Sequence, residues 1–248
     1  MQDVGTLSII ATPIGNMDDI TIRSIKTLFS VDAIVCEDTR KTGQLLRELQ
    51  KRHPELAVPS NGEKFQRMMS YYEENELSRI PEVISALKSG LHIALVSDAG
   101  TPTVSDPGFK LVRECIKEGI SIDSLPGPSS VVLALTLSGL PTDKFIFLGY
   151  PPRKPGHRKD FFMNAKKSQE SMSSTMIYFE APHRMVQVLE ELLEAFGDTQ
   201  IVICREMTKL HQEIRRELIS QSLVHFKKVP PRGEFVLVIN LQVNGSQE

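Results

Sequence analysis

The chain has 248 residues, a formal net charge of −2 and 40% hydrophobic residues. This length has room for one large or two modest domains, and the composition is ordinary for a globular protein and too polar for a membrane protein. The near-neutral charge excludes a protein that coats nucleic acid through a uniformly positive surface, so any such contact must be local.

Short apolar runs alternate with longer amphipathic segments through the first half of the chain. Because parallel strands need long crossovers, this order predicts a largely parallel, helix-covered sheet in a first domain at residues 1–125. A loop is expected at residues 53–63. The expected strands are residues 7–11, 33–36, 67–71, 91–97 and 120–124. The expected helices are residues 20–29 capped by Asp18 or Asp19, 41–50, 76–89 with its regular part from about Pro81, 109–118, and 130–137.

The rhythm changes beyond Gly139, where strands outnumber helices. This pattern predicts a mixed sheet in a second domain at residues 126–248, and the whole chain is assigned to the α/β class. Beyond Gly139 the expected strands are residues 145–149, 175–180, 200–205, 214–219 and 234–241, and the only two helices expected to separate them are residues 157–167 and 183–196.

Three segments rich in glycine, proline and small hydroxyl residues directly follow predicted strands, at residues 12–16, 98–102 and 126–130. Each is ordinary turn chemistry when taken alone. In open α/β sheets, however, ligands bind at the carboxyl ends of strands, so the three together are predicted to line one crevice. None forms G-x-G-x-x-G or G-x-x-x-x-G-K-[ST], which argues against the common dinucleotide and nucleoside triphosphate sites.

Eight short strings cover nearly the whole chain in a recognisable order. They are ATPIGN, CEDTRKT, SDAGTPTVSDPG, LPGPSS, GLPTDKF, FEAPHR, REMTKLHQE and RGEFVLVI. In this order they resemble the tetrapyrrole methylase fold family, and within it the branch that methylates small-subunit ribosomal RNA. Two departures from that branch are Lys41, where a histidine is usual, and residues 71–76, which lack the usual histidine.

The resemblance implies a homodimeric, two-domain methyltransferase with S-adenosylmethionine in a cleft between the domains. Its expected target is the ribose 2′-OH of a cytidine in the decoding region of 16S rRNA. Chains of the branch often continue into a small helical extension, so RNA affinity is expected to rest on the cleft and the dimer here. The implied cofactor contacts are Pro13, Asp98, Ala99, Gly100, Thr101, Ser129 and Ser130 in the three loops, and Phe179, Glu180, Met207 and Gly233 in the second domain.

Two residues are candidates for accepting the proton of the ribose hydroxyl, a reaction that requires no metal. Asp38 ends the second predicted strand and could act as base or orient the ribose; alternatively it caps the next helix or pairs with Arg40. His183 has a side chain that titrates near neutrality, but a histidine at a helix start is also a common surface or packing residue.

A basic stretch around residues 153–167 is the main candidate for RNA contact, opposed in that interval only by Asp160. A solvated helix face is the alternative interpretation of such a charge run. Arg184 has the planar donor geometry suited to phosphate. The predicted RNA-binding residues are Arg40, Arg153, Lys154, Arg158, Lys159, Arg184 and Lys209.

Two other functions remain open from the residues alone. One is a corrin or porphyrin C-methyltransferase of the same fold, although such enzymes usually have a glycine-rich first loop; the other is a non-catalytic module that binds nucleotide or RNA. The start has no basic segment followed by an apolar stretch, and no apolar run could span a bilayer, so a cytoplasmic protein without a membrane partner is expected. The three cysteines lack metal-site spacing and are expected to be buried thiols.

Overall fold

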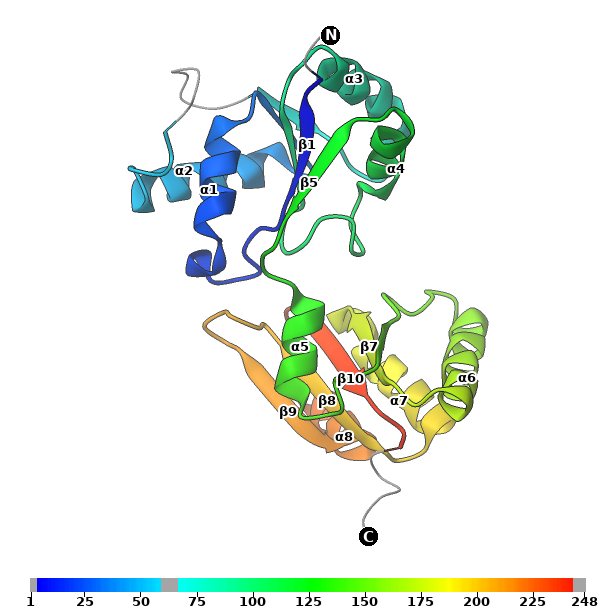
Figure 1. Ribbon diagram of the computed structural model, residues 1–248. Coiled ribbons are helices and arrows are strands. Elements are labelled where there is room, and N and C mark those ends of the chain that lie inside the picture. The colour runs from blue at the N-terminus through cyan, green and yellow to red at the C-terminus, as the bar shows by residue number, and fades with distance from the viewer. Residues whose placement is uncertain (1–3, 59–66, 243–248) are drawn as a thin grey trace. The chain divides into compact units, whose positions relative to one another are not determined.

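The computed structural model describes residues 4–58 and 67–242. The chain forms two compact units, Met1–Ser129 and Ser130–Glu248, and each contains one five-stranded sheet (Figure 1). The expected combination of a parallel first sheet and a mixed second sheet is confirmed.

The first unit is a parallel sheet with strand order β3-β2-β4-β1-β5. Its strands are β1 (Thr6–Ile10), β2 (Ala33–Cys36), β3 (Arg67–Ser70), β4 (Ile93–Val96) and β5 (Ser121–Leu125). Its helices are α1 (Ile22–Ser30), α2 (Thr39–Arg52), α3 (Glu76–Lys88) and α4 (Phe109–Lys117), with a 3₁₀ turn η1 (Met17–Asp19) before α1.

Side chains along these strands alternate between two covered faces, as the pleat of a β-strand requires. Ile34 and Val96 pack with α1 and α2, whereas their chain neighbours Val35 and Leu95 pack with α3 and α4. Helices cover both faces of the sheet (Figure 1), which explains why the central strands β2 and β4 are continuous apolar runs.

The second unit has the strand order β6-β7-β10-β8-β9, in which only the β6–β7 pair is parallel. Its strands are β6 (Phe145–Phe147), β7 (Thr175–Glu180), β8 (Gln200–Arg205), β9 (Glu213–Leu218) and β10 (Phe235–Ile239). Its helices are α5 (Ser130–Ser138), α6 (Pro155–Ser171), α7 (Met185–Phe196) and α8 (Ile219–Lys228), with a 3₁₀ turn η2 (Pro182–Arg184) before α7.

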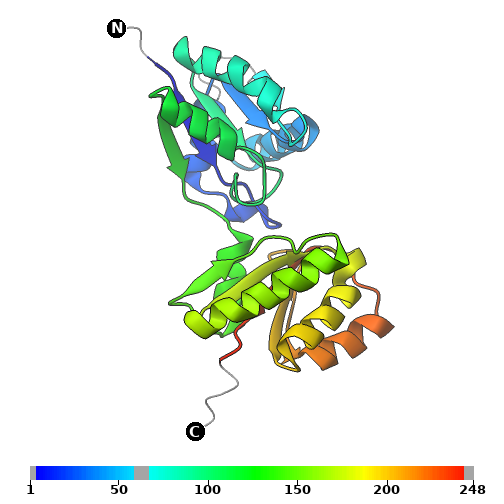
Figure 2. The same ribbon diagram turned by 90° about the vertical axis from the view of Figure 1, so that its right-hand side faces the viewer.

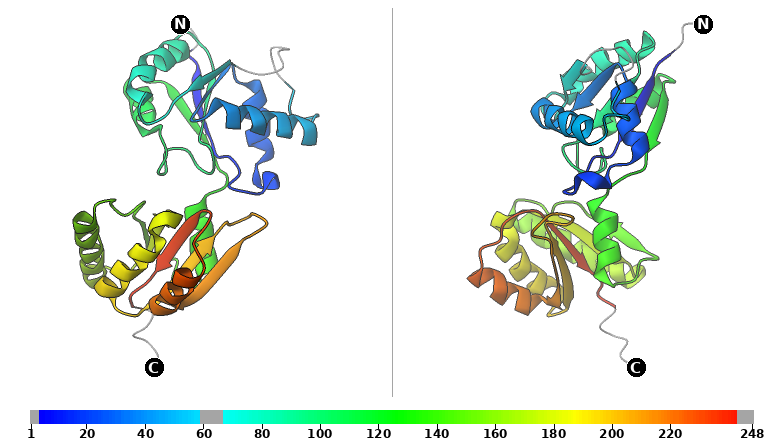
Figure 3. Two further views of the ribbon diagram at one scale, coloured as in Figure 1. Left: turned by 180° about the vertical axis from the view of Figure 1, so that it is seen from behind. Right: turned by 90° about the vertical axis from the view of Figure 1, so that its left-hand side faces the viewer.

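Helices cover both faces of the second sheet. Figure 2 shows α6, α7 and α8 side by side, and their buried side chains form one core with alternate residues of β7, β8 and β10. The apolar helix α5 packs on the opposite face, against β10 (Figure 3). Because both faces of the sheet are covered, polar side chains that contact a ligand must come from the strand ends and the loops that follow them.

Four details of the expected elements were wrong or incomplete. Thr21, and not Asp18 or Asp19, caps α1, because its hydroxyl accepts from Ser24 N at 3.1 Å. Helix α3 begins at Glu76 and runs through Pro81. Helix α8 was not expected, and the segment that starts at His183 begins as a 3₁₀ turn. The expected loop at 53–63 lies partly outside the described residues.

Candidate functional site

The three small-residue loops meet at one end of the first sheet. Thr12 and Gly100 exchange backbone hydrogen bonds of 2.9 and 3.0 Å, which joins the loops after β1 and β4. The Thr101 hydroxyl donates to Pro128 O at 2.9 Å and joins the loops after β4 and β5. The three segments therefore meet, although only the segments after β1 and β4 contribute to the cavity described below.

The topology of the sheet places these loops where an open α/β sheet can hold a ligand. β1 and β4 are neighbours, but the chain leaves β1 toward β2 on one side and leaves β4 toward β5 on the other. The connection after β1 leads to α1 on one face of the sheet and the connection after β4 leads to α4 on the other, and a crevice forms beyond the carboxyl ends of such a strand pair.

A cavity of about 340 Å³ lies at this end of the first unit. Its walls include Thr12 and Pro13 from the first loop, Lys41 and Leu45 from α2, and Asp98 after β4. This volume is within the range of about 300–1,000 Å³ that small-molecule pockets occupy. Of the predicted cofactor contacts, Pro13 and Asp98 line it directly.

Asp98 is held from two directions. Its Oδ1 accepts from the backbone N of Asp38 at 3.2 Å, and its Oδ2 accepts from Lys41 Nζ at 2.6 Å. The hydrogen bond to Asp98 raises the pKa of Lys41, so the ammonium stays charged at neutral pH. One quarter of the Asp98 side chain is exposed, which leaves the carboxylate within reach of a ligand.

Asp38 is the N-cap residue of α2 and pairs with Arg40. Its Oδ1 accepts from Arg40 N at 2.8 Å, and its Oδ2 accepts from Arg40 Nη2 at the same distance. These hydrogen bonds hold the pKa of Asp38 well below its usual range. A carboxylate of low pKa is a poor proton acceptor near neutral pH, so the geometry favours the capping alternative for this residue.

Two further carboxyl groups lie near Asp98 and were not among the sequence candidates. Burial, reinforced by the charges of Glu37 and Asp98, raises the pKa of Asp106 to about 6, against a hydrogen bond from Ser97 that lowers it. Burial and the charge of Asp98 also raise the pKa of Glu37. Glu37 directly follows the buried strand β2, and Asp106 is the second aspartate of the string SDAGTPTVSDPG, so both positions were visible in the sequence.

Comparison with known proteins identifies the family. The family described as Tetrapyrrole (Corrin/Porphyrin) Methylases matches residues 6–222. The chain belongs to this family. A Thermotoga maritima protein named Ribosomal RNA small subunit methyltransferase I is 43% identical over 96% of this chain and 99% of its own. A protein of the same name from Halalkalibacterium halodurans is 39% identical, over 96% of this chain and 76% of its own.

Solved structures share the fold of this methylase at low sequence identity. A diphthine synthase superposes with a TM-score of 0.67 at 15% identity, covering 95% of this chain and 90% of its own. A cobalt precorrin-4 methyltransferase superposes with a TM-score of 0.62 at 18% identity, covering 94% of both chains. At these identities the likeness establishes the fold alone.

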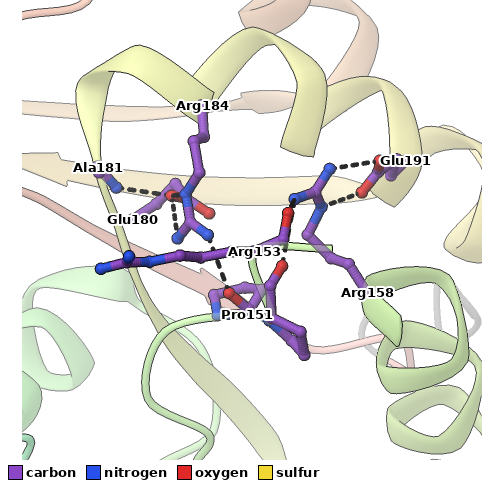
Figure 4. A network of polar contacts seen from close by, with 8 residues as sticks. Pro151, Arg153, Arg158, Glu180, Ala181, Arg184 and Glu191 are labelled. Carbon is purple, nitrogen blue, oxygen red and sulfur yellow. Dashed lines mark hydrogen bonds and ion pairs between the residues drawn. The ribbon is translucent and has the colours of Figure 1, made fainter. Parts of the chain in front are cut away.

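In the second unit of this methylase, Glu180 ends β7 and is 2% exposed. Its Oε1 accepts from Ala181 N at 2.7 Å and from Arg184 Nε at 2.9 Å, whereas its Oε2 has no partner among the described residues (Figure 4). Burial raises the pKa of Glu180, and the Ala181 N–H and Arg184 oppose that rise. A buried oxygen without a partner is uncommon, and it can accept a donor from a ligand.

The other predicted cofactor contacts of the second unit are placed by packing. The Phe179 ring lies edge-on to Tyr150 with 5.5 Å between centroids, and Met207 is 6% exposed. Gly233 has φ of 93°, and a Cβ there would lie 2.7 Å from the Glu206 side chain. None of these observations tests cofactor contact, which stays a prediction for these residues and for Ala99, Ser129 and Ser130.

Arg158 requires a correction. It was predicted to contact RNA, but it is 1% exposed, and its guanidinium donates to both carboxylate oxygens of Glu191. The basic stretch at residues 153–167 thus includes one residue of an internal ion pair, because Arg158 is on the side of α6 that faces α7. Arg184 is only 12% exposed and pairs with Glu180. Neither guanidinium is open to a phosphate.

The remaining cations predicted to bind RNA are reachable from solvent to different degrees. Arg153 and Lys154 are exposed and have no ion-pair partner in the described part of the chain. The paired ones are Arg40 with Asp38, Lys159 with Glu194, and Lys209 with both Glu206 and Glu234. His183 is exposed on η2, and its role as a base stays a prediction.

Residues 4–58 and 67–242 contain neither a metal site nor a membrane-spanning helix. No three histidine, cysteine, aspartate or glutamate side chains there are grouped so that they could hold a metal ion. No helix there combines the length and apolarity needed to cross a bilayer. The three cysteines are free and buried.

Proposed function

We propose that this protein is an S-adenosylmethionine-dependent methyltransferase of small-subunit ribosomal RNA, acting on the ribose 2′-OH of a cytidine in the decoding region. The observation that carries the proposal is the 43% identity to a Ribosomal RNA small subunit methyltransferase I over 96% of this chain. The cytidine and its 2′-OH come from the resemblance of the eight strings described above.

The residues of the first unit fit S-adenosylmethionine, which supplies an electrophilic methyl group on sulfur when bound. The loops after β1 and β4 contribute Thr12, Pro13 and Asp98 to the walls of a cavity of suitable size. Asp98 offers a fixed carboxylate, which suits the cationic or hydroxyl groups of such a ligand.

Transfer to a hydroxyl requires that the enzyme orient the hydroxyl and accept its proton. His183 is our candidate acceptor, because its imidazole is exposed on η2 and Asp38 is occupied as a helix cap. We expect His183→Ala to lower kcat at saturating RNA while the Kd for S-adenosylmethionine stays unchanged.

The decisive experiment offers tritiated S-adenosylmethionine with either small ribosomal subunits or a precorrin. We expect label in 16S rRNA, and mass spectrometry of nuclease digests should find 2′-O-methylcytidine from the decoding region. Label in the precorrin would replace the proposal by C-methylation, and cofactor binding without transfer to either would indicate a non-catalytic module.

A second experiment tests the cofactor site. Asp98→Ala should abolish binding of S-adenosylmethionine in a calorimetric titration, and Asp18→Ala, an exposed site in the same unit, is the control. Undiminished affinity in the Asp98 variant would place the cofactor elsewhere. The homodimer implied by the resemblance is a separate prediction, which light scattering of the purified protein tests.

A further inference from the structure

The loop between β6 and α6 carries the exposed part of the basic stretch. Arg153 and Lys154 are exposed, and neither side chain has a hydrogen-bond or ion-pair partner among residues 4–58 and 67–242. Tyr150, at the start of the same loop, is 55% exposed and lies edge-on against Phe179. Two cations and an aromatic ring therefore stand within five consecutive residues.

Two guanidinium groups, one buried and one largely buried, donate hydrogen bonds to the backbone of this loop. Arg158 Nη1 donates to the carbonyls of Pro152 and Arg153 at 3.2 and 3.1 Å. Arg184 Nη1 donates to the carbonyl of Pro151 at 3.0 Å. Three consecutive carbonyls thus accept from side chains, and Figure 4 shows the Arg153 side chain extending away from Arg158.

Each guanidinium is itself fixed by a carboxylate. Glu191 on α7 accepts from Arg158, and Glu180 at the end of β7 accepts from Arg184. Placing a charged pair inside a protein costs free energy that its attraction only partly offsets, so such pairs are weak evidence for a role in stability. Here the guanidinium N–H groups that do not bind a carboxylate donate to the backbone of one loop.

The consequence is a loop whose conformation is set before any partner arrives. Pro151 and Pro152 restrict their own φ angles, and the carbonyls of residues 151–153 are anchored. A preformed segment loses little conformational entropy on binding, so more of each contact appears as affinity.

We propose that this braced loop, residues 150–154, is a preformed binding segment for single-stranded RNA. Arg153 and Lys154 contact phosphates, Tyr150 stacks on a base, and Arg158 and Arg184 are positioning residues that do not touch RNA. Cations combined with an exposed aromatic ring are the features that hold single strands without reading sequence. The inference rests on the proposed ribosomal RNA substrate.

The first test removes the two exposed charges. For the double variant R153Q/K154Q we expect the Kd for transcribed 16S rRNA to rise about tenfold, and the salt dependence of log K to fall by about 1.4, because each phosphate contact to a single strand contributes about 0.7. K227Q/K228Q removes two adjacent exposed lysines from α8 of the same unit and is the matched control. If R153Q/K154Q has the same Kd and the same salt dependence as this control, the proposal is overturned.

The second test asks whether Arg158 acts through the loop. R158K keeps the charge but loses the forked donor geometry. We expect it to raise KM for RNA, to leave kcat and the Kd for S-adenosylmethionine unchanged, and to have no further effect in the R153Q/K154Q background. Effects that add in the combined variant would overturn the positioning role, because independent sites are additive.

If R158K does not fold, a variant of Glu191, the ion-pair partner of Arg158, provides the same test. E191Q leaves Arg158 in place without its ion pair and is judged by the same comparison in the loop-variant background. If the wild-type protein neither binds nor methylates 16S rRNA, the proposed function fails; if it does both while R153Q/K154Q is unaffected, the loop inference alone fails.

Discussion

Gly127 lies where the loop after β5 passes closest to the end of β1. A Cβ at this position would be 2.8 Å from Ala11 Cβ, which is closer than two carbon atoms can approach. Because Ala11 is 1% exposed and its Cβ is attached directly to the backbone, one of the two loops must move. We expect Gly127→Ala to destabilise the protein by about 1–3 kcal/mol and to weaken cofactor binding.

Gly156→Ala is the matched control for this substitution. Gly156 is in the first turn of α6, and a Cβ there would meet no atom within 4 Å. This variant should be neutral or slightly more stable, by up to about 1 kcal/mol. Urea unfolding and calorimetric titration with S-adenosylmethionine measure the two effects, and equal behaviour of the two alanine variants would contradict the close approach of the loops.

Asp106 gives the stability of the first unit a dependence on pH. Burial raises its pKa to about 6, so between its ordinary pKa and about pH 6 the folded protein holds a proton that the unfolded chain has lost. Stability from this residue is therefore complete at low pH and is lost as pH rises through about 6. Asp106→Asn should stabilise the protein at pH 8, by on the order of 1–3 kcal/mol.

The pH profile of unfolding checks this prediction. The gain of the Asp106 variant over wild type should shrink from pH 6 downward and vanish below about pH 4, where both states of the wild-type residue are protonated. Asp160→Asn, at an exposed position of α6, controls for the loss of one negative charge. A gain that is the same at pH 4 and pH 8 would show that the aspartate carboxyl is not perturbed.

Single residues also show where inference from sequence reached its limit. The positions of Pro13 and Asp98 directly after strands were sufficient to predict their shared edge, because the order of strands along the chain decides where loops meet. Arg158 could not be understood in this way, because its partner Glu191 is 33 positions away. A run of charged residues shows only which residue types are present, whereas the burial of each side chain depends on which side of the helix faces its neighbour.

At the scale of elements, α3 is the helix that departs most from its sequence. Pro81 is its sixth residue and is exposed, and it removes one backbone hydrogen bond from the helix interior. Pro81→Ala should restore that bond without altering the core. We expect a stabilisation of about 1–2 kcal/mol, because the gain in helix propensity exceeds the greater freedom of the unfolded chain.

Pro155→Ala is the control for this helix prediction. Pro155 is the first residue of α6, where the missing N–H is not needed by the helix. Its substitution should change the free energy of unfolding by less than about 0.5 kcal/mol. Urea midpoints of the two variants measure the difference, and a Pro81 variant no more stable than wild type would mean that the missing hydrogen bond does not weaken α3.

The same reasoning explains which elements were predictable. The buried strands β7 and β8 are apolar runs bounded by polar residues, so their limits were predicted correctly from sequence. Helix α8 was missed, because its start is stabilised by Asp198, whose carboxylate accepts from both Ser220 N and Ser220 Oγ. A cap 22 positions upstream gives no local signal, and the preceding strand runs directly into the helix.

For the whole molecule, charge and architecture limit where RNA can bind. The chain carries a formal net charge of −2, so attraction to RNA cannot come from the overall field. Five of the cations predicted to contact RNA are already paired with carboxylates within their own unit. Arg153 and Lys154, which have no ion-pair partner within the described ranges, are thus the positions at which a change of charge should alter RNA affinity most.

The two compact units also lead to a prediction about folding. Helix α5 belongs to the second unit, where Val131 and Leu135 are buried and Arg216 Nε donates to Ser138 O at 3.3 Å. α5 covers the face of β10 opposite to α6, α7 and α8, and an uncovered apolar face favours aggregation. A fragment of residues 130–248 should therefore fold, whereas one of residues 139–248 should not.

These two fragments differ by nine residues, which makes the comparison sharp. We expect the longer fragment to unfold cooperatively on heating, followed by circular dichroism, because it keeps a complete core between two layers of helices. The shorter fragment should bind a hydrophobic dye and lose its cooperative transition, because the side chains of β10 beneath α5 become exposed. Equal cooperativity in both fragments would mean that α5 is dispensable for the second unit and that the three helices on the other face suffice.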